Sequence, residues 1–289
     1  METDCVEGRP MFNIDDLIDT SRVWEHVRHG TGKGVRVAIL DTGVEATHPA
    51  LEGSVVSCHE VAPQGRTFTY RPVSDGDLVG HGTACAGIIH QLAPEAELHS
   101  MRVIGRSSSG TVEQLIHGLR WAIREGFDLV NLSLGTVQKQ QVSVLQELVD
   151  EAYFKGTILI AAANNSRQVS YPAQFASLIA VDNQSFKDPL SFHFRAGQPV
   201  EIVANGIYVY APSPGGKYRW FTGTSFACPH ITGLVARVRS VFPKLTPFQI
   251  KTLMWCLRSN RDGLQERGAG EVALEPEASV DAAIRQSAS

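Results

Sequence analysis

Three short segments of the chain carry an aspartate, a histidine and a serine among small residues. Asp41 follows an apolar run at residues 35–40, His81 lies between two glycines, and Ser225 follows Gly-Thr at the start of a helical pattern. A serine hydroxyl becomes nucleophilic when a histidine takes its proton, and a carboxylate fixes the tautomer of that histidine and stabilises its cation. The three residue types therefore suit nucleophilic acyl transfer.

Each of these residues alone has an ordinary structural interpretation. Asp41 is also typical of a strand end that turns at Gly43, and His81 of a structural or surface histidine. Ser225 also suits a helix N-cap.

A different class of serine enzyme, the α/β-hydrolases, can be excluded. An α/β-hydrolase would place its serine in Gly-x-Ser-x-Gly, ahead of the acid and the histidine in the chain. Here the order is Asp, His, Ser, and the serine lies in Gly-Thr-Ser-Phe-Ala.

The elements that must position these residues alternate between strands and helices. Helices are predicted from the capping box at Thr111, over residues 142–154, from Thr246-Pro247, and from Ser225 through residue 241. We expect strands buried on both faces at residues 35–40, 100–104, 129–134, 157–163, 178–181 and 200–204. The pattern predicts an α/β fold, a doubly wound and mostly parallel sheet with helices on both faces.

The three segments together resemble the signature blocks of the subtilase (subtilisin-like serine protease) family. The blocks are Asp-Thr-Gly at 41–43, His-Gly-Thr at 81–83 and Gly-Thr-Ser-x-Ala-x-Pro-His at 223–230, in the chain order of subtilisin. The resemblance runs from about residue 23 to about residue 283. It implies a subtilisin-like serine endopeptidase that needs no cofactor or metal.

The resemblance also assigns roles to individual residues. Ser225 is the expected nucleophile, His81 the base and Asp41 its partner, while Asn165 and the Ser225 N–H form the oxyanion hole; Asn164, where the family has glycine, leaves the choice of asparagine open. A peptide substrate is expected to add as a strand between two segments and to enter pockets beside them. The expected substrate-binding residues are Ser108, Ser109, Gly110, Val112, Leu115, Ser133, Leu134, Gly135, Ala162, Ala163, Ser170, Tyr171 and Thr224.

The sequence departs from many secreted members of that family at the N-terminus and at the usual calcium site. Residues 1–20 are expected to form a short N-terminal extension, as in intracellular subtilisins, and residues 21–289 the catalytic domain. The extension is either a disordered tail or a segment lying over the cleft. The short segment after His81 and Ala50 in place of an acidic ligand predict that the usual calcium site is missing.

Composition narrows the partners and the compartment. The formal net charge is −4 and 43% of the residues are hydrophobic, so neither a nucleic-acid surface nor an anionic-membrane surface is expected. The acidic N-terminus does not resemble a secretory signal, and five cysteines without a CxxC pair do not suggest a disulfide framework. We therefore expect a cytoplasmic enzyme acting on protein or peptide substrates.

Two rival functions remain open from the sequence. One is a dedicated protease that matures a peptide precursor, which would keep the same triad. The other is an inactive peptide-binding module on the same scaffold, although such modules commonly lose a triad residue and this chain keeps Asp41, His81 and Ser225.

Overall fold

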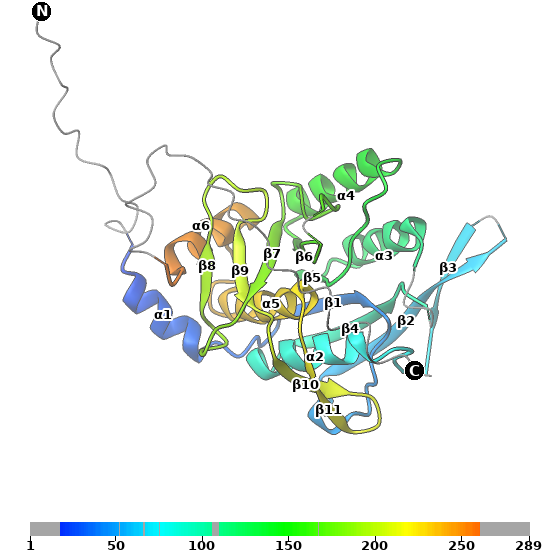
Figure 1. Ribbon diagram of the computed structural model, residues 1–289, viewed down its shortest axis with the longest axis horizontal. Helices are drawn as coiled ribbons and strands as arrows, with labels where there is room; N and C mark the ends of the chain where they lie inside the picture. Colours follow the sequence, from blue (N-terminus) through cyan, green and yellow to red (C-terminus); the bar gives the residue numbers. More distant parts are fainter. Residues whose placement is uncertain are drawn as a thin grey trace, which may run out of the picture. The chain divides into compact units, whose positions relative to one another are not determined.

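A central nine-stranded sheet organises the computed structural model, which describes residues 18–260 except 52, 66, 75, 106–109 and 167. The strands follow the order β3-β2-β4-β1-β5-β6-β7-β9-β8 (Figure 1). The antiparallel edge strands are β3 (Thr67–Pro72) and β8 (Phe192–Phe194). Between them lie the parallel strands β2 (Val55–Gln64), β4 (Glu97–Arg102), β1 (Arg36–Asp41), β5 (Leu129–Leu132), β6 (Ile158–Ala162), β7 (Ile179–Gln184) and β9 (Ile202–Asn205).

Helices cover both faces of this sheet, as the sequence pattern predicts. One core cluster joins the sheet to α1 (Thr20–His29), α2 (His81–Leu92), α5 (Thr224–Val241) and α6 (Pro247–Leu257). A second cluster joins the opposite face to α3 (Val112–Arg124) and α4 (Val142–Lys155) (Figure 1). The fold is therefore the predicted doubly wound α/β arrangement.

Strand β1 shows how the two faces are divided. Val37 and Ile39 are buried in the cluster that contains α2 and α5, whereas Ala38 and Leu40 are buried in the cluster of α3 and α4. Side chains alternate along a strand. The next residue, Asp41, therefore falls on the side of α2 and α5, which carry the histidine and the serine of the candidate triad.

The predicted elements correspond closely to the observed ones. The predicted capping box at Thr111 and the predicted N-cap at Thr246 are present, Thr246 also forms a capping box with Gln249, and the predicted helix starting near Ser225 is α5. All six predicted strands occur with shifts of a few residues at their ends, as is usual for element boundaries. The strands that the sequence analysis did not predict are β2, β3, β8 and the separate hairpin of β10 (Val209–Ser213) and β11 (Lys217–Phe221).

The predicted boundary between extension and catalytic domain lies at the edge of what the structure describes. Residues 1–17 of the expected extension and residues 261–289 of the expected domain fall outside the described residues. Helix α1 begins at Thr20, with the Asp19 side chain accepting a hydrogen bond from the Arg22 backbone N–H. Among the described residues, no helix combines the length and apolar character needed to cross a membrane.

Candidate active site

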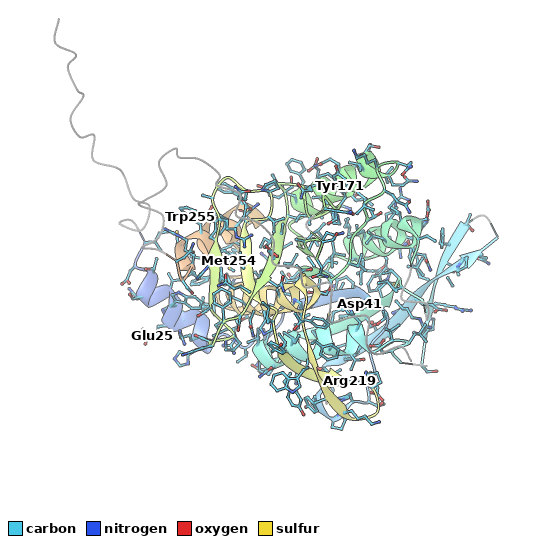
Figure 2. The ribbon with its side chains drawn as sticks, viewed as in Figure 1. Glu25, Asp41, Tyr171, Arg219, Met254 and Trp255 are labelled. Carbon is cyan, nitrogen blue, oxygen red and sulfur yellow. The ribbon has the colours of Figure 1, made fainter. Side chains whose placement is uncertain are left out.

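Asp41 and His81 form a hydrogen-bonded pair at the carboxyl edge of the sheet. Asp41 is the last residue of the central strand β1 (Figure 2), is only 1% exposed, and accepts from the Thr42 N–H at 2.7 Å. His81 is the first residue of α2, and its Nδ1 lies 2.8 Å from the same Asp41 Oδ1. The Nδ1–H donates to the carboxylate, so the neutral ring carries its lone pair on Nε2, where a base must accept a proton.

The glycines beside His81 allow this close approach. A Cβ on Gly82 would lie 2.1 Å from the Gly43 carbonyl oxygen, so no larger residue fits between α2 and the end of β1. Gly80, the N-cap of α2, has a φ of 101° and backs onto Pro214, which a Cβ would approach to 2.7 Å. Glycine on each side of His81 therefore permits the close contacts found at both positions.

Ser225 is the second residue of α5, and the helix N-cap is Gly223. The alternative interpretation of Ser225 as the cap is therefore wrong. Its hydroxyl donates to the Ser133 carbonyl at 3.1 Å, and the Ser133 hydroxyl donates to the Ser225 carbonyl at 2.8 Å. Within the described residues, no hydrogen bond joins the Ser225 hydroxyl to His81. Catalytic hydrogen bonds are often long before substrate binds.

Contacts with Cys85 and Phe226 nevertheless show that His81 and Ser225 lie close to each other. The Cys85 sulfur lies 3.9 Å from His81 Nδ1 and 3.5 Å from the Ser225 carbonyl oxygen. Phe226, which follows Ser225 directly, has its ring centroid 5.2 Å from that of His81. The sequence-predicted histidine and serine therefore share one neighbourhood, one on α2 and one on α5.

A buried polar chain lies beneath Ser225. The Asn131 side-chain amide donates through Nδ2 to the Ser133 hydroxyl at 3.0 Å, and the Thr232 hydroxyl donates to the Asn131 Oδ1 at 2.9 Å. Both Asn131 and Thr232 have no exposed surface, so these bonds satisfy groups that would otherwise be costly to bury. The sequence analysis missed this support, although a polar residue within the apolar strand at 129–132 was its signal.

His81 is the histidine of this region whose pKa is raised, and the pKa shifts of His230 and Cys85 have a different cause. Burial alone lowers the pKa of His81, but the charge of the Asp41 carboxylate and its hydrogen bond outweigh burial, and the net shift is upward. Burial lowers the pKa of His230 to about 4, and its Nδ1–H donates to the Phe226 carbonyl. Burial raises the pKa of the Cys85 thiol, which disfavours the thiolate that a cysteine nucleophile needs.

The two asparagines at 164 and 165 point to different places. The Asn165 Oδ1 accepts from the Thr224 N–H at 2.9 Å, beside Ser225. Asn164 instead accepts from Ser166, through the backbone N–H and the hydroxyl. The Asn165 side chain is thus held next to the residue that precedes Ser225, and its amide nitrogen can act as a donor, which favours Asn165 over Asn164 for the oxyanion hole.

The expected substrate strand lies against a second segment. Residues 133–135 follow β5, and Thr136 next to them pairs with Tyr171 through two backbone hydrogen bonds of 2.8 Å. Ser170 is 3% exposed and lies beside Gly135, within 4 Å of the position a Cβ would take there. Leu134 is partly buried against the α3–α4 cluster. The structure thus places Ser133, Leu134, Gly135, Ser170 and Tyr171 together.

Several of the remaining residues predicted to line substrate pockets are buried. Thr224 is 1% exposed and its hydroxyl donates to the Ala163 carbonyl at 2.7 Å, next to Ala162 at the end of β6. Val112 and Leu115 are buried at the start of α3. Gly110 is close to the Val103 carbonyl, and Ser108 and Ser109 lie outside the described residues. The assignment of these residues to substrate pockets stays a prediction.

Potential metal ligands at the site are engaged in hydrogen bonds. Ligand atoms of Asp41, His81 and Cys85 lie within 4.8 Å of one another, and the Asp41–His81 hydrogen bond lies inside this group. Helix α2 runs uninterrupted through residues 86–92, where the usual calcium loop was predicted to be missing. The His48 ring accepts from the Ala50 N–H through Nδ1 and donates through Nε2 to the Lys217 carbonyl.

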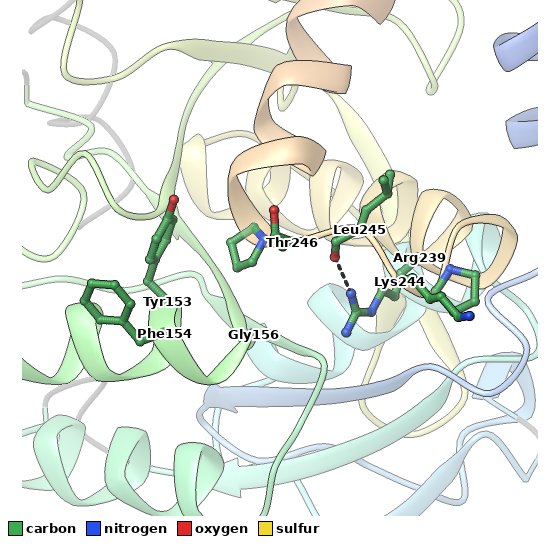
Figure 3. Close-up of a pocket in the computed structure, with 9 residues that line it drawn as sticks. Tyr153, Phe154, Gly156, Arg239, Lys244, Leu245 and Thr246 are labelled. Carbon is green, nitrogen blue, oxygen red and sulfur yellow. Dashed lines mark hydrogen bonds between the residues drawn. The ribbon is translucent and has the colours of Figure 1, made fainter.

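A pocket of about 420 Å³ lies away from these residues (Figure 3). It is bounded by the end of α4, including Tyr153 and Phe154, and by the α5–α6 connection. Arg239 donates to the Leu245 carbonyl there. The lining offers no aspartate, histidine or serine, so it contributes nothing to the chemistry at Asp41, His81 and Ser225.

Comparison with known proteins gives a consistent result. The subtilase family model matches residues 32–267. The chain is 36% identical over 261 residues to Subtilisin Savinase from Lederbergia lenta, covering 86% of this chain and 93% of that protein. It is 36% identical over 237 residues to M-protease from Shouchella clausii, covering 78% and 59%.

Solved structures agree with the sequence relatives. A cold adapted subtilisin-like serine proteinase matches with a TM-score of 0.66 and 28% identity, covering 78% of this chain and 82% of the other. Sphericase matches with a TM-score of 0.64 and 27% identity, covering 77% and 82%. Fold and site thus define a serine peptidase with an α/β subtilisin-like scaffold.

The chain belongs to the subtilase family. It is a serine endopeptidase that hydrolyses peptide bonds through the Asp-His-Ser mechanism of that family. The predictions of family, fold and activity are confirmed, and the substrates are proteins or peptides.

Proposed function

We propose that Ser225, His81 and Asp41 perform this hydrolysis as nucleophile, base and orienting carboxylate. The observation that carries the assignment is the 2.8 Å bond between His81 Nδ1 and Asp41, which leaves Nε2 as the accepting nitrogen. The Ser225 oxygen attacks the scissile carbonyl while Nε2 takes its proton. His81 then gives this proton to the leaving amine, and the acyl-enzyme is hydrolysed by water through the same base.

The proposed oxyanion hole consists of the Asn165 amide and the Ser225 backbone N–H. Ser225 lies in the first turn of α5, where backbone N–H groups have no partner within the helix. Asn165 is positioned by the hydrogen bond that its Oδ1 accepts from the Thr224 N–H. Donors fixed in advance at the developing negative charge stabilise the transition state without reorganisation.

The proposed substrate site runs along residues 133–135. A peptide that adds as a strand here uses backbone hydrogen bonds, which gives affinity with little sequence demand. The buried Ser170 beside Gly135 supplies a hydroxyl and extra bulk where a substrate side chain would enter. We expect this to favour small or medium side chains at that subsite.

The test is the variant Ser225→Ala measured beside the wild type. Turnover of a peptide substrate and labelling by a fluorophosphonate probe should both disappear, while the thermal unfolding midpoint stays close to that of the wild type. Turnover that survives in a folded Ser225→Ala variant would contradict the assignment. Wild-type protein that binds peptides without any labelling would favour the inactive binding module.

We also propose a cytoplasmic location. The described cysteines Cys58, Cys85 and Cys228 are free thiols, which suits a reducing compartment. Detection of the active protein in the soluble cytoplasmic fraction of the producing cell tests this proposal. Recovery of the enzyme outside the cell would contradict it.

A further inference from the structure

Asp77 lies just before α2 and has no role in the chemistry described so far. Its Oδ1 accepts from the Thr42 hydroxyl at 2.6 Å, from the Val79 N–H at 3.0 Å and from the Gly80 N–H at 2.8 Å. Its Oδ2 accepts from the Thr83 N–H at 2.8 Å and from the Thr83 hydroxyl at 2.7 Å. Both oxygens of one carboxylate are therefore saturated by donors from three separate places.

These donors belong to the two segments that carry the acid–base pair. Gly80 precedes His81, Thr83 lies two residues after it in the first turn of α2, and Thr42 follows Asp41 at the end of β1. The Thr42 hydroxyl also accepts from the Gly82 N–H at 3.0 Å. Thr42 thus provides a second link between Asp77 and the helix. Thr42 is the residue after Asp41, and its partner Gly82 is the residue after His81.

The helix itself offers no substitute for this carboxylate. The N-cap of α2 is Gly80, which has no side chain to accept from the first turn. Unpaired N–H groups at a helix start need an acceptor, and a carboxylate there is also favoured by the helix dipole. Asp77 and Thr42 supply that acceptor from outside the helix.

We propose that Asp77 is a positioning residue that clamps the start of α2 to the end of β1 and so sets the Asp41–His81 hydrogen bond. This inference rests on the proposed roles of Asp41 and His81. The carboxylate acts through geometry: these hydrogen bonds join it to Thr42, to the loop at residues 79–80 and to Thr83, and none of them involves the His81 ring.

Asp77→Asn tests the clamp with little change of shape. An asparagine has one acceptor oxygen and one NH₂ group, so it cannot accept from both sets of donors at once. The two titratable groups that act on the pKa of His81 are Asp41 and Cys85. A change in the pH profile of Asp77→Asn therefore reports a loosened Asp41–His81 bond.

We expect kcat per titrated active site to fall by about 10- to 100-fold, the loss typical of a small misplacement of catalytic groups. KM should stay unchanged, and the acidic inflection of kcat/KM should move to lower pH as the Asp41 bond weakens. The matched control is Asp128→Asn. Asp128 accepts from the Arg36 N–H and from Arg239 at the opposite end of β1. Its variant should lose stability but keep kcat and the inflection.

A second pair of variants covers the case in which Asp77→Asn does not fold. Thr42→Val removes the bridging hydroxyl at nearly constant volume, and Thr42→Ser restores it. We expect the loss of kcat and the acidic shift in Thr42→Val and recovery in Thr42→Ser. Unchanged kcat and inflection in Thr42→Val, or in a folded Asp77→Asn with only a lower Tm, would overturn the clamp.

The proposed triad fails in a different way. If Asp41 and His81 do not act as assigned, Asp41→Asn leaves activity and its pH profile unchanged in the same assay. If only the clamp is wrong, Asp41→Asn is severely impaired while the Asp77 and Thr42 variants behave like Asp128→Asn.

Discussion

The acid–base half and the nucleophile half of the triad are built from different interactions. On the α2 side, a buried carboxylate bonds His81, and a second carboxylate, Asp77, bonds the start of the helix. On the α5 side, the hydroxyl of Ser225 donates to the Ser133 carbonyl and the hydroxyl of Ser133 donates to the Ser225 carbonyl. The neutral side chains of Asn131 and Thr232 extend this network.

This difference predicts how each half responds to solution conditions. Charged hydrogen bonds are stronger than neutral ones, and they depend on the protonation state of their partners. The acid–base half should therefore respond to pH and to charge-removing substitutions. The nucleophile half contains no group that titrates near neutrality among its described partners, so its geometry should stay constant while the acid–base half changes.

The largest expected effect comes from removing either half. Ser225→Ala and His81→Ala should each lower kcat by about 10⁶-fold, a magnitude measured in subtilisin itself, a member of this family. Because the halves act as one unit, the double variant should be no worse than either single variant. Steady-state kinetics on one peptide substrate measures all three. A double variant whose loss is the product of the two single losses would show that the halves act independently.

Asp41→Asn tests the charge in the acid–base half. Loss of the carboxylate favours the wrong tautomer of His81 and should lower kcat by about 10⁴-fold, as in other triads of this kind. The pKa of His81 is raised by Asp41, so the protonated, inactive base persists above the ordinary value of about 6.5 in the wild type. Removing Asp41 takes away the largest upward contribution to the pKa of His81, so this pKa should fall.

The wild-type kcat/KM should accordingly rise with pH through an inflection above about 6.5. In Asp41→Asn the inflection should lie lower. A pH series of kcat/KM measures both, with Ser133→Ala as a control from the nucleophile half that should leave the inflection in place. A wild-type profile that is flat from about pH 5 to 8 would remove His81 from the role of base.

Asn165→Ala probes the oxyanion hole on the nucleophile side. We expect a loss of about 10²–10³-fold in kcat, the magnitude measured at the oxyanion-hole asparagine of subtilisin, a member of the same family. Asn164→Ala is the matched control, because its side chain bonds Ser166 and points elsewhere. Near-normal kcat in Asn165→Ala with a large loss in Asn164→Ala would reverse the assignment.

The smallest expected effect concerns calcium. With no carboxylate in residues 86–94 and Ala50 in place of an acidic ligand, the usual site has too few oxygen ligands for a hard cation. Metal-stripped protein should show the same Tm with excess calcium and with chelator, since no linked binding energy is lost. A fall of several degrees on chelation would show that a calcium site is built from other residues.

The sequence predicted the parts of the fold that have strong local signals. Parallel strands buried on both faces appear as continuous apolar runs, and the capping box at Thr111 and the Thr246-Pro247 pair mark helix starts without tertiary context. The hairpin of β10 and β11 was missed because β11 is exposed along nearly its whole length. Strand β2 was missed because its partly exposed residues form no apolar run.

The residues of the site also fall into those that the sequence could predict and those that it could not. Asp41, His81 and Ser225 could be predicted because small residues surround each of them and because their chain order is diagnostic. Asp77 could not, since most of its partners are backbone N–H groups of a loop and a helix start, which leave no mark in side-chain chemistry. The bond between Ser225 and the Ser133 carbonyl likewise depends on where two distant chain segments meet.

The rate of fluorophosphonate labelling as a function of pH, with the modified residue mapped by mass spectrometry, tests the joint action of the two halves most directly. We predict modification at Ser225, with a rate that rises through an inflection above about 6.5 in the wild type and through a lower one in Asp41→Asn. Modification of another residue, or a labelling rate at Ser225 that is independent of pH and of Asp41, would contradict the account.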